Sequence, residues 1–307
     1  MKLGHVIESQ QFTLPMLVEL FEVADQMERI IARGGTQDYQ NKIMASLFYE
    51  HSTRTRFSFE SAMYRLGGKV LSTERANTFS SVAAGETLED TIRVVSSYAD
   101  VIVLRHNEIG GAARAAAIST VPIVNAGDGK GGQHPTQALL DLYTIYKGVK
   151  TIEGVKVALV GNLTDGRTVR SLAYLLGKFE RVKLYFVAPD SFQIKQDILD
   201  YLTKHNVWFA RESNLKKILP EVDVVYSTRI EPELLTQRGE RLETISQYFI
   251  DDTLLKLLPS HALVMHPLPR LHEISPTVDS NSRAVYFKQT KNGVLIRMAL
   301  LASVLGY

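Results

Sequence analysis

Short runs of apolar residues alternate with longer stretches of helical periodicity along most of this chain. The runs 43–48 and 101–104 contain no charged residue, as is typical of strands that are buried on both faces. Between them, the apolar residues of 57–66 recur at helical spacing and are followed by Gly67-Gly68, which predicts a helix and its end. Strands that alternate with helices are typical of parallel α/β units.

The same alternation continues through both halves of the chain. It predicts strands at 43–48, 69–72, 101–104, 122–125, 155–161, 182–187, 207–210, 222–227 and 263–266. It predicts helices from Thr13, over 57–66 and 87–98, from His134-Pro135, and over 168–177, 197–204 and 294–305, the last of them amphipathic. The predicted fold class is therefore α/β, with two doubly wound parallel-sheet domains and a C-terminal helix.

Length also favours two domains, because a chain of 307 residues exceeds the ~100–200 residues of a typical domain. We place the boundary in the stretch 146–153, so that the first domain covers 1–146 and the second 147–307. The last helix, near 294–305, has the option of packing back on the first domain.

Composition removes several classes of function. A formal net charge of +2 gives no electrostatic footprint for nucleic acid. The chain has no cysteine, which excludes thiolate nucleophiles and cysteine-bound zinc. No apolar run approaches the ~20 residues that span a bilayer, and the first residues do not resemble a secretory signal, so we expect a cytoplasmic protein without a membrane partner.

Polar clusters follow three predicted strands of the first half, where ligands of parallel sheets bind. The strongest is Ser52-Thr53-Arg54-Thr55-Arg56, which places hydroxyls, cations and backbone N–H groups at a helix start and so predicts a phosphate site. Arg105-His106 follows the strand 101–104. His134-Pro135-Thr136-Gln137 opens a helix, and residues 134 and 137 face the same side. The alternative for each cluster is an ordinary helix cap or a solvated surface.

Arginines follow two predicted strands of the second half. Gly166-Arg167-Thr168 opens a helix, and Thr228-Arg229 follows the strand 222–227. Two arginines at one sheet edge suit a substrate with two carboxylates, although surface placement is the alternative. The prolines of His266-Pro267-Leu268-Pro269-Arg270 fix an extended loop whose carbonyls are suited to hold an NH₂ group.

The sequence gives little support for a nucleotide-binding site or a metal site. The glycine-rich segment 127–132 does not follow the dinucleotide pattern, and Val160-Gly161-Asn162 lacks the further glycines. No spacing of Asp, Glu and His indicates a metal site, and we predict neither a metal nor a cofactor.

Taken together, these clusters resemble the aspartate/ornithine carbamoyltransferase family over essentially the whole chain. Ser52-Thr53-Arg54-Thr55-Arg56 is similar to the family's carbamoyl phosphate signature, and His134-Pro135-Thr136-Gln137 to a second motif. The segment 161–172, Thr228-Arg229 and the loop 266–270 resemble the aspartate branch. The ornithine branch typically has a cysteine near the last loop.

The resemblance implies a carbamoyl phosphate domain followed by an amino-acid domain, in a homotrimer with shared sites. It implies transfer of a carbamoyl group from carbamoyl phosphate to L-aspartate, as in pyrimidine synthesis, without a cofactor. It does not say whether a regulatory chain binds. The resemblance also implies a role for each site residue. Phosphate would be held by Ser52, Thr53, Arg54 and Thr55, and the carbonyl oxygen would be held by Thr55, Arg105 and His134. The NH₂ group would be held by Gln137 and the carbonyl of Leu268, and the aspartate carboxylates would be held by Arg167 and Arg229.

Two positions depart from the family pattern. The loop 75–86 carries Ala84 where the aspartate branch has a lysine that reaches the neighbouring subunit's site, while Ser80 remains as a contact. Glu231 stands where the family usually has glutamine, and it would repel a substrate carboxylate, pair with a cationic substrate or neutralise Arg229. Two alternatives therefore stand beside aspartate transfer, namely a different amine acceptor and a catalytically impaired paralogue that binds a ligand or a partner.

Overall fold

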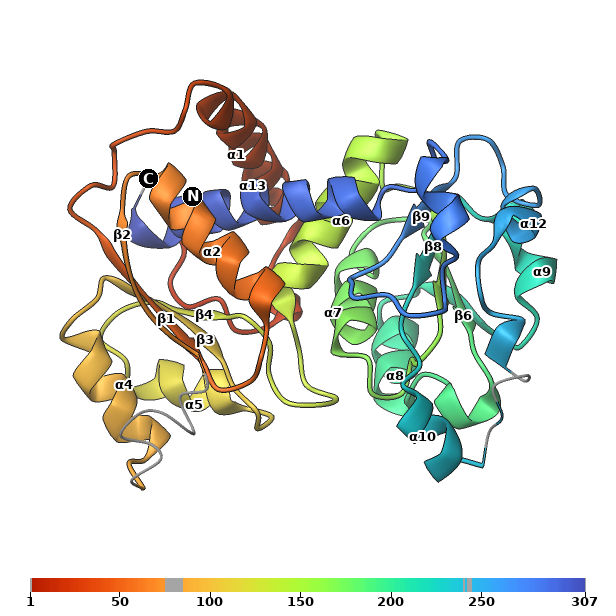
Figure 1. Cartoon of the computed structure of the whole chain (residues 1–307), viewed down its shortest axis with the longest axis horizontal. Coiled ribbons are helices and arrows are strands. Elements are labelled where there is room, and N and C mark those ends of the chain that lie inside the picture. Colours follow the sequence, from red (N-terminus) through yellow and green to blue (C-terminus); the bar gives the residue numbers. More distant parts are fainter. Residues whose placement is uncertain (1, 75–84, 240, 242–244, 307) are drawn as a thin grey trace. The chain divides into compact units, whose positions relative to one another are not determined.

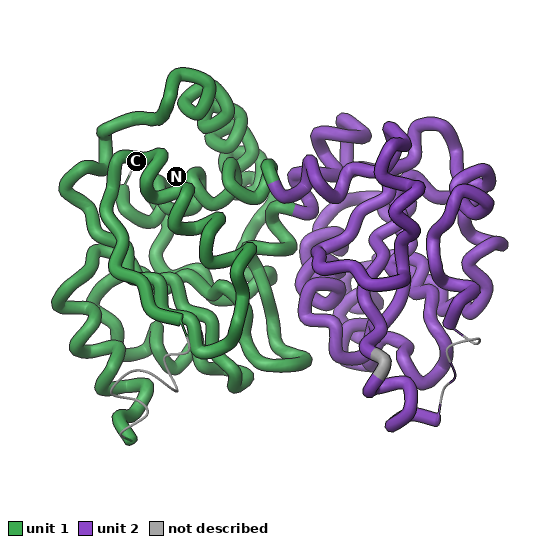
Figure 2. Tube along the Cα trace, in the orientation of Figure 1, with its two compact units in different colours: residues 1–140, 291–307 green, residues 141–290 purple. Residues whose placement is uncertain are grey.

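The computed structural model in Figure 1 describes residues 2–74, 85–239, 241 and 245–306. The chain divides into two compact units, which Figure 2 colours separately. Unit 1 comprises Met1–Leu140 and Lys291–Tyr307, and unit 2 comprises Asp141–Thr290. No helix within the described ranges is long and apolar enough to cross a membrane.

Unit 1 is built on a four-stranded parallel sheet in the order β2-β1-β3-β4. Its strands are β1 (Ile43–Phe48), β2 (Lys69–Glu74), β3 (Val101–Arg105) and β4 (Ile123–Asn125). Its helices are the 3₁₀ helix η1 (Ser9–Gln11), α1 (Leu14–Ala32), α2 (Thr53–Arg65), α4 (Leu88–Ser96), α5 (Gly111–Ile118), the first turns of α6 (Pro135–Val149) and most of α13 (Tyr286–Leu305).

Alternation along the strands assigns the two faces of this sheet to different helices. Ala45 and Leu47 of β1 pack with Ile102 and Leu104 of β3 in an apolar cluster that also contains Ile92 of α4. Successive strand residues point to opposite faces, so the even-numbered residues of β1 point the other way. That second face is covered by α2, since Ser46 donates a hydrogen bond to a glutamate of that helix.

The C-terminal helix differs from its prediction in extent and in character. It was expected near 294–305 with one polar face, but α13 begins at Tyr286 and its residues 295–304 are all buried. Its one arginine in that stretch, Arg297, lies over the Phe59 ring at 5.0 Å and donates to Ser58 Oγ at 2.8 Å. The prediction of an amphipathic helix was therefore wrong. From the sequence alone, a buried arginine with partners inside the protein cannot be told from one that faces solvent.

Unit 2 carries a five-stranded parallel sheet in the order β7-β6-β5-β8-β9. Its strands are β5 (Lys156–Val160), β6 (Lys183–Val187), β7 (Trp208–Glu212), β8 (Val224–Ser227) and β9 (Leu263–Met265). Its helices are the rest of α6, α7 (Arg167–Leu176), η3 (Asp190–Phe192), α8 (Gln196–Lys204), α9 (Leu215–Ile218), η4 (Leu219–Glu221), α10 (Pro232–Gln237), α12 (Asp252–Leu255), η5 (Pro276–Ser280) and the start of α13.

The class predicted from the sequence is confirmed, since both sheets are parallel and are flanked by helices. The change between the units falls elsewhere than expected. The sequence predicts the boundary within 146–153, whereas the units change after Leu140, inside the continuous helix α6. A helix that passes from one unit to the next leaves no loop for a sequence reading to detect.

Candidate functional site

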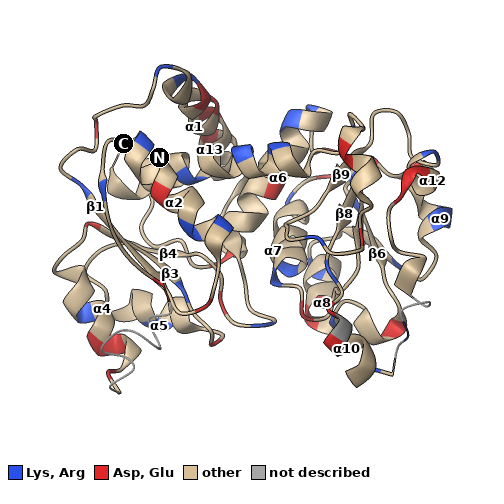
Figure 3. Ribbon diagram, viewed as in Figure 1, with Lys and Arg blue, Asp and Glu red and all other residues tan. Residues whose placement is uncertain are grey.

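Each sheet reverses its strand order at one point, and in parallel sheets ligands bind beyond the carboxyl ends of the strands at such a point. In unit 1 the reversal lies between β1 and β3, and in unit 2 it lies between β5 and β8. The predicted site residues lie at or after the carboxyl ends of β1, β3 and β4 in unit 1 and of β5, β8 and β9 in unit 2. Lys and Arg are spread over both units among Asp and Glu, as Figure 3 shows, so the basic character of each site is local.

In unit 1, the segment after β1 forms the start of α2. Ser52 is the N-cap residue, but its side chain makes no capping hydrogen bond. Thr53 and Arg54 in the first turn are exposed, whereas Thr55 is buried. Backbone N–H groups of a first helical turn lack partners within the helix and attract anions, so this start is suited to a phosphate.

Arg56, the last residue of the cluster 52–56, contacts side chains of α2 and β2. Its guanidinium lies 3.3 Å from Glu74 and 3.9 Å from Glu60. It also donates to Ser72 Oγ at 3.3 Å. These contacts give Arg56 a structural role on the outer side of α2 and β2.

Arg105 lies at the carboxyl end of β3, directly opposite Phe48 of β1 in the register. Its side chain is only 10% exposed, forms an ion pair with Glu50 at 3.2 Å and donates to the carbonyl of Ala126 at 3.2 Å. Alternation places this side chain on the face of the sheet that α2 covers. The structure therefore brings Arg105 and the start of α2 to one edge of the sheet.

The third cluster of unit 1 begins where β4 leads into α6. His134 precedes the first residue of α6 and is buried, and its ring Nδ1 lies 3.4 Å from Thr136 Oγ1. Gln137, also buried, donates its backbone N–H to the carbonyl of His134 at 3.0 Å. His134 and Gln137 thus share a helix start at the same edge as Arg105.

His106, the neighbour of Arg105, does not join this group. Its Nδ1 accepts from the backbone N–H of Glu108 at 3.1 Å, and its ring packs on Tyr49 with centroids 4.7 Å apart. Burial lowers the pKa of His106 below its usual value. We interpret His106 as a neutral, structural histidine.

In unit 2, the loops after β5 and β8 approach each other closely. Gly161 has a φ of +113°, and a Cβ added there would lie 2.3 Å from the carbonyl oxygen of Thr228. Thr228 in turn donates its backbone N–H and its hydroxyl to the carbonyl of Val160, at 2.8 Å and 2.9 Å. Only glycine fits this contact without strain, and the contact fixes the backbone on which Arg167 and Arg229 follow.

The two predicted carboxylate-binding arginines have different surroundings. Arg167 is the first residue of α7 and is partly buried. Arg229 follows β8, and its Nη2 lies 2.5 Å from Oε1 of Glu231. Of the three roles that the sequence left open for Glu231, the structure thus shows a pairing with Arg229.

The loop after β9 is held by a buried histidine. The carboxylate of Glu273 accepts from His266 Nε2 at 2.8 Å, and His266 Nδ1 accepts from the backbone N–H of Leu268 at 2.8 Å. Both side chains are buried, and burial lowers the pKa of His266. Leu268 adopts a φ of +55° and precedes a cis peptide bond to Pro269. The prediction of an extended loop is therefore wrong at Leu268, whose backbone is left-handed and whose N–H is held by His266.

Three predicted or neighbouring positions complete the account. Arg270 is bound to Asp279 and donates to Tyr286 Oη at 3.0 Å, so it stabilises unit 2. Ser80 and Ala84 lie outside the described residues.

The sequence did not reveal two carboxylates that stand near predicted site residues in the chain and pair with arginines. Glu50 pairs with Arg105, and Asp165 accepts from Arg238 at 2.5 Å in the loop before α7. Glu50 stands just before the phosphate cluster, so its place in the sequence was a usable signal. The pairing of residues 165 and 238 joins distant segments and gives none.

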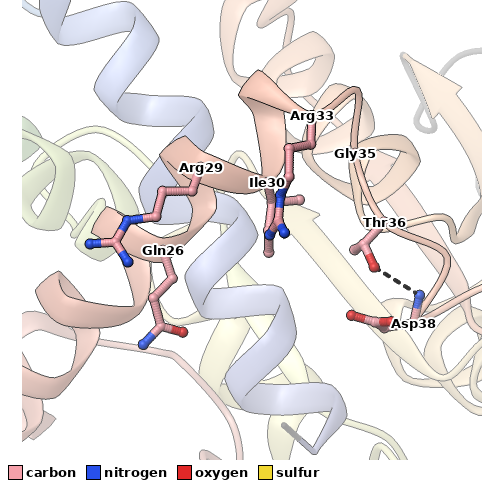
Figure 4. Close-up of a pocket in the computed structure, with 7 residues that line it drawn as sticks. All are labelled: Gln26, Arg29, Ile30, Arg33, Gly35, Thr36 and Asp38. Atoms are coloured by element: carbon pink, nitrogen blue, oxygen red, sulfur yellow. Dashed lines mark hydrogen bonds between the residues drawn. The ribbon is translucent and has the colours of Figure 1, made fainter.

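Unit 1 also has a pocket of about 500 Å³ near the end of α1. Its lining, drawn in Figure 4, contains none of the predicted site residues and consists of Gln26, Arg29, Ile30, Arg33, Gly35, Thr36 and Asp38. The backbone N–H of Thr36 donates to the carbonyl of Arg65 at the end of α2, and α2 ends just before β2 begins. This pocket therefore lies toward the amino ends of the strands, away from the edge that carries Arg105.

Family models divide the chain between residues 147 and 153, near the boundary predicted from the sequence and after the point where the two compact units change. Residues 4–147 match the model of the aspartate/ornithine carbamoyltransferase carbamoyl-P binding domain, and residues 153–304 match that of the Asp/Orn binding domain. A chloroplastic aspartate carbamoyltransferase of Oryza sativa is 53% identical over 99% of this chain and 86% of its own length. The aspartate carbamoyltransferase catalytic subunit of Thermoplasma acidophilum is 43% identical over 98% of both chains.

Solved structures give the same result. The aspartate transcarbamoylase of Trypanosoma cruzi in complex with N-(phosphonacetyl)-L-aspartic acid superposes with a TM-score of 0.93 at 38% identity, covering 99% of this chain and 97% of that one. The catalytic subunit of the M. jannaschii enzyme gives 0.92 at 43% identity, covering 98% of each chain. Two matched domains, full-length relatives and a shared fold show that this chain belongs to the aspartate/ornithine carbamoyltransferase family.

Proposed function

We propose that this chain transfers the carbamoyl group of carbamoyl phosphate to the α-amino group of L-aspartate, giving N-carbamoyl-L-aspartate and phosphate. The observation that carries the proposal is the placement of Arg105 and the start of α2 at one sheet edge, in a chain whose relatives are named for this reaction. Unit 1 is the proposed carbamoyl phosphate domain, and unit 2 is the proposed aspartate domain.

The proposed mechanism assigns charge stabilisation to unit 1. The uncharged amine attacks the carbonyl carbon, and negative charge builds on the carbonyl oxygen. Phosphate leaves as the C–O bond breaks and takes up the proton that the amine loses. Arg105, His134 and Thr55 would donate to that oxygen. Donors that are fixed before the reaction stabilise the transition state more than the ground state. Arg105 fits this role because two protein groups already hold its side chain.

The remaining proposed contacts concern binding. Ser52, Thr53, Arg54 and Thr55 would hold the phosphate, with the start of α2 supplying backbone donors. Gln137 and the carbonyl of Leu268 would hold the NH₂ group, and Arg167 and Arg229 the two carboxylates of aspartate. No step in this scheme needs a covalent intermediate or a cofactor.

A homotrimer is part of the proposal. Phe57 and Tyr64, which lie seven positions apart on α2 and so on one side of this helix, are 54% and 62% exposed. Two large exposed apolar side chains on one side of a helix favour an interface, here with a second copy of the chain. Light scattering on the purified protein would test it, and a monomer at micromolar concentration would contradict it. A cytoplasmic location also stays a prediction, since the rice relative is named as chloroplastic.

The test of the reaction is an assay of ureido product from carbamoyl phosphate and a panel of amines that includes aspartate and ornithine. The wild type should convert aspartate, and N-(phosphonacetyl)-L-aspartate should inhibit it. Ala84→Lys, measured beside it, restores the family's lysine. If aspartate reacts only in this variant, the wild type has another acceptor or no catalytic role, and activity with another amine decides between these.

A further inference from the structure

We propose that Glu231 is a specificity-determining residue that competes with the acceptor's second carboxylate for Arg229. The inference rests on the proposed function, because it takes Arg229 as a carboxylate-binding arginine. It goes further by naming the residue that weakens this binding. Aspartate would bind unit 2 more weakly than it would with an uncharged residue at position 231.

The geometry commits the carboxylate of Glu231 to Arg229. Glu231 is the N-cap residue of α10, yet its side chain makes no capping hydrogen bond. A carboxylate at this position would ordinarily accept from the backbone of the first helical turn and gain from the helix dipole. Instead, Oε1 accepts from Nη2 of Arg229 at 2.5 Å. Among the described residues, the contact with the arginine thus replaces the local cap.

Burial and charge make the pair competitive rather than fixed. The side chains of Arg229 and Glu231 are 36% and 32% exposed, so solvent and a ligand reach both. A partly exposed ion pair stabilises little, and a ligand carboxylate can replace one partner. The displaced Glu231 then stays nearby as a like charge, which disfavours a second carboxylate on the ligand but not a neutral group.

The predicted consequence is selectivity between dicarboxylates and monocarboxylates. Succinate has the two carboxylates of aspartate without its amine, and butyrate lacks one of them. Removing the charge of Glu231 should improve the binding of succinate and leave that of butyrate unchanged. Such a pattern separates competition for Arg229 from a general change of fold or of net charge.

The experiment compares wild type, Glu231→Gln and Glu180→Gln by calorimetry with succinate and with butyrate, in the presence of inorganic phosphate and at constant ionic strength. Glu180 is the matched control, since it loses the same charge in unit 2 from a side chain that is 80% exposed in the loop before β6. Glu231→Gln should bind succinate about two- to fivefold more tightly, as expected for loss of a partly exposed ion pair. Its KM for aspartate should fall by the same factor, with kcat and the KM for carbamoyl phosphate unchanged.

Several outcomes would overturn the inference. Weaker or unchanged succinate binding by Glu231→Gln would mean that Glu231 orients Arg229 instead of competing with the ligand. An equal gain for butyrate would show an unspecific charge effect, and absence of succinate binding in both proteins would remove Arg229 as a dicarboxylate site. Glu231→Asp, which keeps the charge, should bind succinate like the wild type. Failure of the proposed reaction would appear separately, as succinate binding without ureido product from aspartate.

Discussion

The two units place arginines at equivalent points of two parallel sheets but hold them differently. Arg105 in unit 1 is 10% exposed and is fixed by Glu50 and by a backbone carbonyl, whereas Arg229 in unit 2 is 36% exposed and pairs with a residue two positions further along. An arginine that is already ordered loses little side-chain entropy when a ligand arrives. The contrast supports the proposed roles, which are charge stabilisation by unit 1 and adjustable binding by unit 2.

Of the changes that test this comparison, removal of Arg105 should have the largest effect, a loss of turnover. Arg105→Ala should lower kcat by roughly 10²–10³-fold, because one preorganised donor to a developing oxyanion contributes about that much. The assay is the ureido product formed at saturating aspartate. Arg114→Ala is the control, since Arg114 also pairs with carboxylates in unit 1, those of Glu89 and Glu108, but has an exposed side chain on α5. A loss below tenfold in Arg105→Ala would place the oxyanion elsewhere.

The next largest effect is on stability and comes from the close contact between Gly161 and Thr228, the residue before Arg229. Gly161→Ala combines a strained φ with an overlap at 2.3 Å and should lower the free energy of unfolding by about 2–4 kcal/mol. Gly154→Ala is the matched control, because Gly154 has a φ of +76° with nothing within 4 Å. It should cost only about 1–2 kcal/mol from the backbone strain. Urea denaturation measures both, and equal losses would contradict a special contact at Gly161.

The smallest effect concerns acid stability, through the loop after β9. Burial places the pKa of His266 below the 6.5 of a free histidine, so below about pH 6.5 the unfolded chain binds more protons than the folded one. Stability should therefore be fully present above that pH and decrease as the pH falls. His266→Gln, which keeps one donor and one acceptor, should reduce this dependence between pH 7 and 5. An unchanged slope in His266→Gln would refute the assignment.

Local patterns predicted much of this molecule, and long-range pairing explains the rest. The predicted strand 43–48 agrees with β1, because a buried parallel strand is an uninterrupted apolar run. The helix α5 was missed, since an eight-residue alanine-rich segment that begins with glycine has no side-chain cap and little periodicity. The edge position of Arg105 followed from its strand, but its partner Glu50 and the pair of Asp165 with Arg238 depend on tertiary contacts.

Unit 1 consists of two separate stretches of the chain, which has a consequence for folding during synthesis. Residues 291–305, synthesised after all of unit 2, supply to unit 1 a helix segment that meets its first residues, since Leu3 donates to the carbonyl of Ser303 at 2.9 Å. Unit 2 is one continuous stretch and can fold during synthesis as a unit. In unit 1, the apolar surface that α13 covers stays exposed until residues 291–305 have been synthesised. Unit 1, although synthesised first, is therefore completed last.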